Sequence, residues 1–207
     1  MPIMKYFVTG GAGFIGSNFL RYLLNRYQNI RILNFDELIY AGNLNNLSSV
    51  ENDQRYTFIK GDIWEIKKNR KCIQPDYVVN FAAETHVDRS ILYPDIFVKS
   101  NVYGVQNLLQ VSIQQRVKKY LQISTDEVYG SLGKTGKFKE ITPLDPRSPY
   151  SASKAGGDLL TQAYFHTFNL LINSTRCSNN YGPYQFPEKL IPLTILNCMN
   201  GKKFRLW

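Results

Sequence analysis

The feature that most constrains this 207-residue chain is a regular alternation of strand-like and helix-like segments. Six short apolar runs, rich in Val, Ile, Tyr and Phe, are typical of strands buried on both faces: residues 5–9, 30–35, 56–60, 77–81, 119–124 and 171–176. Helical patterns alternate with them over residues 15–27, 65–74, 94–115 and 150–169, and a further one lies near residues 190–199. The alternation predicts an α/β fold with a parallel sheet and helices on both of its faces.

Composition and charge are those of an ordinary globular protein, with 43% hydrophobic and 20% charged residues. No apolar run approaches the roughly 20 residues of a membrane span. The chain enters its first strand without a signal-peptide pattern, so we expect a cytoplasmic protein without a membrane association. The formal net charge of +9 comes from short, scattered basic groups. This scatter favours a solvated surface over a nucleic-acid interface, and positive charge also suits an anionic nucleotide ligand.

Cysteine usage is consistent with a reducing compartment. Cys72, Cys177 and Cys198 are an odd number, are widely spaced and form no C-x-x-C pair. A disulfide framework or a zinc site is therefore not expected, and no other metal site is predicted. We expect buried free thiols.

A glycine-rich turn joins the first predicted strand to the first predicted helix. Gly10, Gly13 and Gly16 have the spacing G-x-x-G-x-x-G. Such glycines allow a tight turn, a close approach of the backbone to a pyrophosphate, and close packing of helix on strand. The helix N-terminus then presents N–H groups and a positive dipole end to the phosphates. The pattern predicts a Rossmann-type, doubly wound sheet that binds a dinucleotide.

An acidic residue at the end of the second predicted strand indicates which dinucleotide is bound. Asp36 lies 20 residues after Gly16, where a carboxylate can bind the adenosine ribose hydroxyls. Because the same carboxylate would repel a 2′-phosphate, NAD is favoured over NADP. Asp62, after the third strand, is a plausible adenine contact.

A tyrosine–lysine pair and a polar strand end make up a candidate reactive centre. Tyr150 and Lys154 are four apart in a helical segment and so share one face. Residues 124–127, Ser-Thr-Asp-Glu, end the fifth predicted strand. Ligands of open α/β sheets bind beyond the carboxyl ends of the strands, so both groups are predicted to meet at one pocket.

Together these motifs resemble the extended short-chain dehydrogenase/reductase superfamily, and within it the dTDP-glucose 4,6-dehydratases. The resemblance rests on residues 9–17, Asp36 with residues 40–43, and residues 82–90, 124–130, 150–154 and 177–192, the last of which reads CSNNYGPYQFPEKLIP. The triplet Thr125-Asp126-Glu127 separates such dehydratases from the epimerases that they otherwise resemble. The resemblance runs almost from end to end of the chain.

The resemblance implies a dehydration with internal return of hydride. Tyr150 would take the proton of the hydroxyl on sugar carbon 4 while hydride passes to NAD. For this its pKa must fall from about 10 toward neutrality, with Lys154 and the positive nicotinamide ring as the expected causes. Glu127, kept ionised, would remove the proton on carbon 5, and Asp126, kept protonated, would protonate the departing hydroxyl of carbon 6. Hydride then returns to carbon 6.

Further binding residues are carried over by the same resemblance. The expected sugar-nucleotide contacts are Thr85, Thr125, Asn179, Lys189 and Leu190. The expected cofactor contacts, besides the three glycines, Asp36, Asp62, Tyr150 and Lys154, are Phe14, Ile15, Ile63, Ala82, Ala83, Ser100 and Asn180. The expected division of the chain is an NAD-binding domain over residues 1–178 that includes the catalytic residues, with the beginning of a smaller substrate-binding lobe over residues 179–207. The resemblance also implies a homodimer built from the helices at 94–115 and 150–169.

Alternatives stay open because the resembled enzymes continue well beyond this length. The chain could be a dehydratase represented by a fragment or a short form, with slow or no turnover because part of the nucleotide clamp is missing. It could be a non-catalytic NAD-binding protein. A 4,6-dehydratase or an epimerase for another nucleotide sugar is the remaining alternative.

Overall fold

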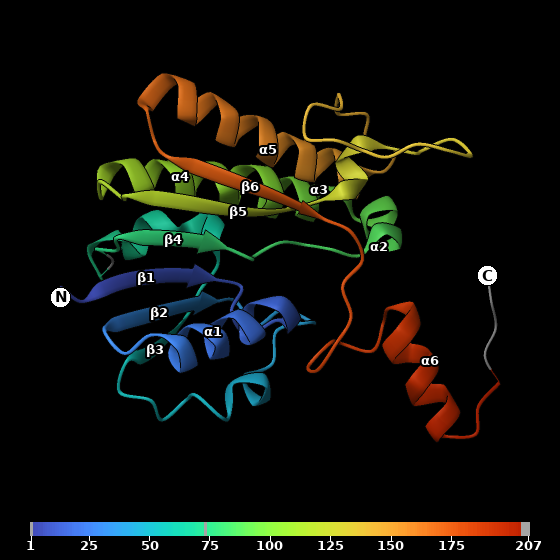
Figure 1. The fold of residues 1–207 in the computed structure, drawn as a ribbon, viewed down its shortest axis with the longest axis horizontal. Helices are drawn as coiled ribbons and strands as arrows, with labels where there is room; N and C mark the ends of the chain where they lie inside the picture. The colour runs from blue at the N-terminus through green and yellow to red at the C-terminus, as the bar shows by residue number, and fades with distance from the viewer. Residues whose placement is uncertain (1, 73, 204–207) are drawn as a thin grey trace.

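The computed structural model describes residues 2–72 and 74–203, and its centre is one all-parallel sheet in the order β3-β2-β1-β4-β5-β6 (Figure 1). The strands are β1 (Met4–Thr9), β2 (Ile30–Asp36), β3 (Tyr56–Lys60), β4 (Tyr77–Asn80), β5 (Lys119–Thr125) and β6 (Ile172–Cys177). The chain starts in the middle of the sheet, winds outward to β3, and crosses back to build the other half from β4. The predicted doubly wound parallel sheet is confirmed.

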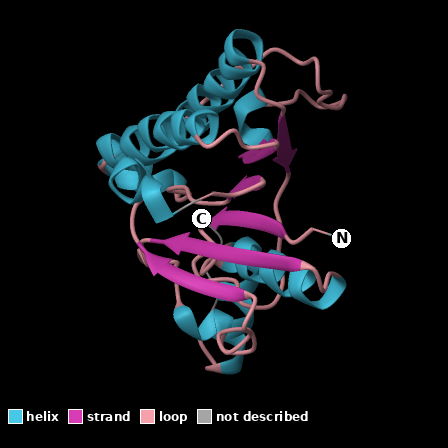
Figure 2. Ribbon diagram, turned by 90° about the vertical axis from the view of Figure 1, so that its left-hand side faces the viewer, coloured by secondary structure: helices cyan, strands magenta, loops and turns pink. Residues whose placement is uncertain are grey.

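Helices lie on both sides of this sheet, as the view turned by 90° shows (Figure 2). Their bounds are α1 (Phe14–Arg26), η1 (Leu44–Leu47), η2 (Ile63–Cys72), α2 (Val87–Leu92), α3 (Pro94–Val98), η3 (Lys99–Gly104), α4 (Val105–Gln114), η4 (Asp126–Tyr129), α5 (Pro149–Phe168) and α6 (Leu190–Met199). The helix predicted at 65–74 is a 3₁₀ helix, η2, and residue 73 lies outside the described residues. The one predicted at 94–115 contains a π-helical turn, η3.

Two apolar cores fill the space between sheet and helices. Along β1, Phe7 and Val8 point to opposite faces because side chains alternate along a strand. Phe7 belongs to the cluster beneath η2, α4 and α5, while Val8 belongs to the cluster beneath α1 and η1. Burial on both faces explains why the strands are continuous apolar runs in the sequence.

Helix α5 is defined sharply at both ends, which matters because it carries Tyr150 and Lys154. The Ser148 side chain accepts from the backbone N–H of Ser151, and Ser151 returns a bond to the backbone of Ser148 in a capping box. Pro149 occupies the first helical turn. These local signals fix where the helix begins, and hence which face Tyr150 presents.

The C-terminal helix α6 stands apart from the sheet (Figure 1) and buries none of its residues. The prediction of buried thiols is therefore wrong for Cys198, which is exposed on α6, and Cys177 is only partly buried. Residues 204–207, whose sequence pattern is typical of the start of a strand, lie outside the described residues. Within residues 2–72 and 74–203, no helix combines the length and the apolar character of a membrane span.

Candidate active site

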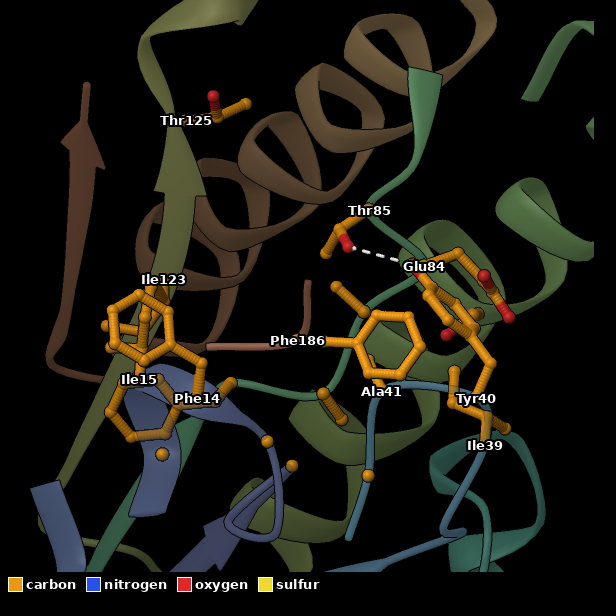
Figure 3. Close-up of a pocket in the computed structure, with 18 of the residues that line it drawn as sticks. Phe14, Ile15, Ile39, Tyr40, Ala41, Glu84, Thr85, Ile123, Thr125 and Phe186 are labelled. Carbon is orange, nitrogen blue, oxygen red and sulfur yellow. Dashed lines mark hydrogen bonds between the residues drawn. The ribbon is translucent and has the colours of Figure 1, made fainter. Parts of the chain in front are cut away.

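A cavity of about 700 Å³ opens at the carboxyl ends of the strands. It is lined by the glycine turn, by the residues that follow β2, β3, β4 and β5, by α5, and by the segment after β6. Figure 3 shows Phe14 and Ile15 at the start of α1 on one side and Tyr40 with Phe186 on the other, below Thr125 at the end of β5. This is the place where ligands bind in open α/β sheets.

The glycine turn leaves no room for a side chain at Gly10 or at Gly16. Gly10 has φ +71°, and a Cβ there would lie 2.4 Å from the backbone nitrogen of Ala82. A Cβ on Gly16 would lie 2.3 Å from the carbonyl oxygen of Gly10. Helix α1 begins at Gly13 without a side-chain cap, so its N-terminus is open to an external anion. The turn therefore has the shape and polarity of a pyrophosphate cradle.

Asp36 is held at the end of β2 by the backbone of two neighbouring segments. One carboxylate oxygen accepts from the N–H of Ala12 over 2.9 Å, and the other accepts from Leu38 over 2.8 Å. Burial raises the pKa of Asp36, and these two bonds oppose the shift. A carboxylate oxygen has more than one acceptor position, so Asp36 keeps capacity for ribose hydroxyls.

At the other end of the cavity, α5 places Tyr150 and Lys154 beside the end of β5. The Lys154 ammonium donates to the carbonyl oxygen of Ile123 over 2.7 Å, and burial lowers the pKa of Lys154 to about 8. Burial raises the pKa of Tyr150, with a further rise from the Glu127 carboxylate, whereas a side-chain hydrogen bond with Thr125 lowers it. The expected depression of the Tyr150 pKa is therefore not found, because desolvation of the phenolate is the largest effect.

The two acids of the triplet lie on different cavities. Glu127 lines the main cavity, but Asp126 lines a second one of about 550 Å³ beside Tyr129. The Thr125 hydroxyl donates to an Asp126 carboxylate oxygen over 3.3 Å and accepts from the backbone N–H of Glu127 over 3.3 Å. Desolvation and the Asp126 carboxylate raise the pKa of Glu127, and Lys189 opposes this. The prediction that one pocket gathers both acids is thus not met in this conformation.

The segment after β6 closes the cavity against the loop after β2. The Tyr40 hydroxyl lies 3.2 Å from the Thr85 hydroxyl (dashed in Figure 3) and donates to Glu188 over 3.3 Å. The Lys189 ammonium donates to the Thr85 carbonyl oxygen over 3.4 Å. Phe186 packs edge-on against the Tyr40 ring. These contacts bring two expected sugar-nucleotide residues, Thr85 and Lys189, to the same wall.

Every predicted site residue except Asp126 lines the main cavity. They are Gly10, Gly13, Phe14, Ile15, Gly16, Asp36, Asp62, Ile63, Ala82, Ala83, Thr85, Ser100, Thr125, Glu127, Tyr150, Lys154, Asn179, Asn180, Lys189 and Leu190. Their individual roles stay predictions. No group of His, Cys, Asp and Glu side chains suited to a metal is found among the described residues.

Several residues of the cavity received no individual role from the sequence. The hydroxyl of Ser124 is buried and has no hydrogen-bond partner among the described residues, although it lines the cavity. The Cys177 thiol lies beside it and donates to the Ser124 carbonyl over 3.7 Å. Trp64 and Lys99 line the end of the main cavity that lies nearest β3. Ser124 belongs to the strand-end group named from the sequence but received no role of its own, whereas the wide separation of β5 and β6 along the sequence gave no sign that Cys177 lies against it.

The sheet order, the glycine cradle, the acid at the end of β2 and the Tyr150/Lys154 pair define a dinucleotide-binding Rossmann protein of the extended short-chain dehydrogenase/reductase type. The chain belongs to the GDP-mannose 4,6 dehydratase family, whose model matches residues 7–206. It is 50% identical to a dTDP-glucose 4,6-dehydratase of Xanthomonas campestris over 95% of the chain and 59% of that relative. The predicted resemblance is confirmed.

Solved structures agree with this family. The chain matches DesIV, a dTDP-glucose 4,6-dehydratase of Streptomyces venezuelae crystallised with NAD, with a TM-score of 0.93 and 48% identity. That match covers 96% of this chain and 63% of DesIV. A UDP-glucose 4-epimerase of Thermotoga maritima matches with a TM-score of 0.89 at 27% identity, over 99% of this chain and 66% of the epimerase. The chain thus spans about 60% of the length of these dehydratases.

Proposed function

We propose that this chain carries the NAD-binding and catalytic portion of a dTDP-glucose 4,6-dehydratase, a hydro-lyase. The observation that carries the proposal is that Thr125, Glu127, Tyr150 and Lys154 share one cavity with the glycine cradle and Asp36. Sequence identity of about 50% to dTDP-glucose 4,6-dehydratases supports the same dehydration reaction for this chain. A protein that only bound a dinucleotide would not need the reactive set.

The residues present fit NAD. The N-terminus of α1 beside this turn carries no side-chain cap and is open to a pyrophosphate, and the lack of a Cβ at Gly10 and Gly16 allows the turn to pack tightly. Asp36 favours ribose hydroxyls over a 2′-phosphate because its carboxylate is buried and negatively charged. When bound, NAD would accept hydride from carbon 4 of the sugar and return it to carbon 6.

Tyr150 is the proposed base at the carbon 4 hydroxyl. Its phenol lies beside the Thr125 hydroxyl, which is the proposed second partner of the same sugar oxygen. Lys154 fixes α5 to β5 through its hydrogen bond to Ile123, and its ammonium is the proposed source of positive charge for the phenolate. Since burial raises the pKa of Tyr150, base action requires positive charge near the phenolate, which Lys154 and a bound nicotinamide ring would supply.

Glu127 is the proposed base at carbon 5. Its pKa is raised, which makes it a stronger base so long as it is ionised at the working pH. Asp126 is the proposed acid at the carbon 6 hydroxyl. Because Asp126 lies on the second cavity, this role requires its side chain to turn toward the sugar.

The nucleotide part of the substrate is proposed to bind along the segment after β6. Lys189, exposed at the cavity mouth, is suited to a diphosphate, and Asn179 and Leu190 lie on the same rim. We propose residues 1–178 as the NAD-binding domain and residues 179–207 as the beginning of the substrate-binding lobe. The exposed apolar residues of α6 are consistent with a helix that packs against further protein.

A cytoplasmic homodimer completes the proposal. Apolar side chains are exposed along the helical face formed by α2, α3, η3 and α5, among them Ile91, Leu92, Tyr93, Val98, Tyr103 and Leu159. Such a face supports association with a second copy. Light scattering tests the dimer, and a monomer at micromolar concentration would contradict it.

The test of the activity is incubation with NAD and dTDP-glucose, followed by detection of the 4-keto-6-deoxy product through its absorbance in alkali. We expect slow formation by the chain as given and none by Tyr150→Phe, while both bind NAD in calorimetry. NAD binding without product would favour a non-catalytic NAD-binding protein. Conversion of UDP-glucose to UDP-galactose would instead assign the chain to the epimerases.

A further inference from the structure

The segment after β6 is fastened to α1 as well as to the loop after β2. We call residues 178–189 of this segment the strap. Residues 178–181, 185, 186, 188 and 189 of the strap line the main cavity, whereas its outer turn, residues 182–184, does not. Figure 1 shows the chain running from the end of β6 past one end of α1 before it reaches α6. The strap therefore forms one wall of the cavity, and its outer turn lies outside that wall.

Two side chains of α1 hold the outer turn of the strap. The Asn18 amide donates to the carbonyl oxygen of Pro183 over 3.1 Å and to that of Phe14 over 2.9 Å. Further along α1, the Arg21 guanidinium lies 3.7 Å from the centre of the Tyr184 ring. A guanidinium over an aromatic face at this distance is a cation–π contact. We call the contacts of Asn18 and Arg21 with the outer turn the clasp.

The Arg21 side of the clasp is held in place independently of the strap. Its Nε donates to the Ser49 hydroxyl over 3.0 Å, and its Nη2 donates to the carbonyl oxygen of Asn46 in η1. These bonds use the edge of the planar guanidinium and leave its flat face for the Tyr184 ring. Arg21 is therefore a fixed surface to which the strap attaches.

The Tyr184 side of the clasp has a backbone conformation that an aromatic residue rarely adopts. Its φ is +70°, in the left-handed region that favours glycine. Such strain persists only where surrounding contacts oppose it, and the Arg21 guanidinium makes such a contact with the Tyr184 ring. The outer turn is thus a strained element that would relax if the clasp opened.

We propose that the clasp sets the rate at which a bound dinucleotide leaves the cavity, because the strap must part from α1 to release it. The inference rests on the proposed NAD binding and assigns Arg21 and Tyr184 as positioning residues. The cavity extends from Tyr150 to Asp36, and the strap lines it together with the glycine turn. A dinucleotide that spans this distance lies between the strap and the N-terminus of α1.

The proposed reaction gives slow release a purpose. Hydride taken from carbon 4 of the sugar must return to carbon 6 of the same molecule, so loss of NADH between the two steps would leave the sugar oxidised at carbon 4. Asn18, Arg21 and Tyr184 lie outside the cavity lining. Their exchange therefore removes no residue from the wall around the dinucleotide, and a change in its release rate reports on the clasp.

Stopped-flow release of NADH tests the clasp, with NADH fluorescence as the signal and excess NAD as the chase. Tyr184→Gly removes the ring and relieves the positive φ. NADH is expected to leave this variant at least about threefold faster, as for loss of a modest cation–π contact. Tyr184→Phe keeps a ring and should stay within about twofold of the unaltered chain. Arg26→Met, at an exposed position of the same helix, is the matched control and should leave the rate unchanged.

A double-substitution cycle separates the clasp from a general loosening of the fold. Arg21→Met is expected to speed release to a similar extent, and adding Tyr184→Gly to it should bring no further change, because both remove one contact. Thermal unfolding without dinucleotide reports on the fold itself. Clasp variants that melt like Arg26→Met yet release NADH faster would support the proposal.

Three results would overturn the clasp while leaving NAD binding in place. They are unchanged release in both single variants, independent effects of the two substitutions, and faster release that merely follows a lower melting temperature. Failure of the unaltered chain to bind NADH would overturn this inference together with the proposed function.

Discussion

The Lys154 ammonium donates to the backbone carbonyl of Ile123 over 2.7 Å, and this bond ties the face of α5 that carries Tyr150 and Lys154 to the end of β5. Ile123 is two residues before Thr125, so the same contact sets the spacing between the tyrosine–lysine pair and the strand-end triplet. The cost is a buried charge, which appears as a pKa of about 8 for Lys154. The position of Lys154 in the candidate site therefore lowers the stability of the fold.

The buried Lys154 makes stability depend on pH in a defined window. Its pKa is about 10.5 unfolded and about 8 folded, so between these values the unfolded chain binds more protons and stability rises with pH. We expect the free energy of unfolding to gain about 3 kcal/mol from this group between pH 8 and 10.5. Urea unfolding of the chain and of Lys154→Met across this range measures the difference. Parallel pH profiles for the two proteins would contradict the prediction.

The pKa of Glu127 is expected to lie above that of a free glutamate, and the charges of its neighbours are expected to change the size of this shift. Removing a negative neighbour in Asp126→Asn should lower its pKa, and removing a positive one in Lys189→Met should raise it. NMR titration of glutamate carboxyl groups, with Glu127→Gln to assign the signal, tests both directions. Shifts of the same sign in the two variants would show that the Glu127 environment is described wrongly.

Gly16→Ala is expected to damage the dinucleotide site and the fold together. Its new Cβ would meet the carbonyl oxygen of Gly10 at 2.3 Å and the backbone of Gly11 at 2.8 Å. Overpacking of this kind costs about 1–3 kcal/mol, and displacement of the turn should abolish measurable NAD binding. Gly133→Ala is the matched control, because no atom lies within 4 Å of its Cβ. Equal NAD affinity in the two variants would argue against the cradle.

The ion pair between Arg176 and Asp158 is expected to matter for stability. Arg176 donates to Asp158 over 2.7 Å and to the Tyr129 hydroxyl over 2.8 Å, and the Asp158 side chain is 1% exposed. Arg176→Leu leaves the buried Asp158 carboxylate without its positively charged partner. The free energy of unfolding should therefore fall by about 3 kcal/mol. Lys118→Leu at the exposed pair with Asp76 is the control and should change little. Thermal or urea unfolding compares them, and similar losses would contradict the distinction.

Much of the fold could be predicted because its signals are local. Buried parallel strands have continuous apolar runs, and α5 begins at its capping box. Short elements such as α2 and η4 were not predicted, since segments this brief show no clear periodicity. The π-helical turn that carries Lys99 was also missed, because it depends on packing against η2 and α5.

The sequence by itself determined the sheet, the glycine turn, Asp36 and the membership of Tyr150, Lys154, Thr125 and Glu127 in one site. Motifs at strand ends determine this much, because a parallel sheet brings all its carboxyl ends to one edge. The tertiary structure alone decided that Asp126 faces a second cavity, that burial raises the pKa of Tyr150, and that Trp64 meets Lys99. Side-chain direction, desolvation and contacts between distant segments arise only when the chain is packed, so no local pattern encodes them.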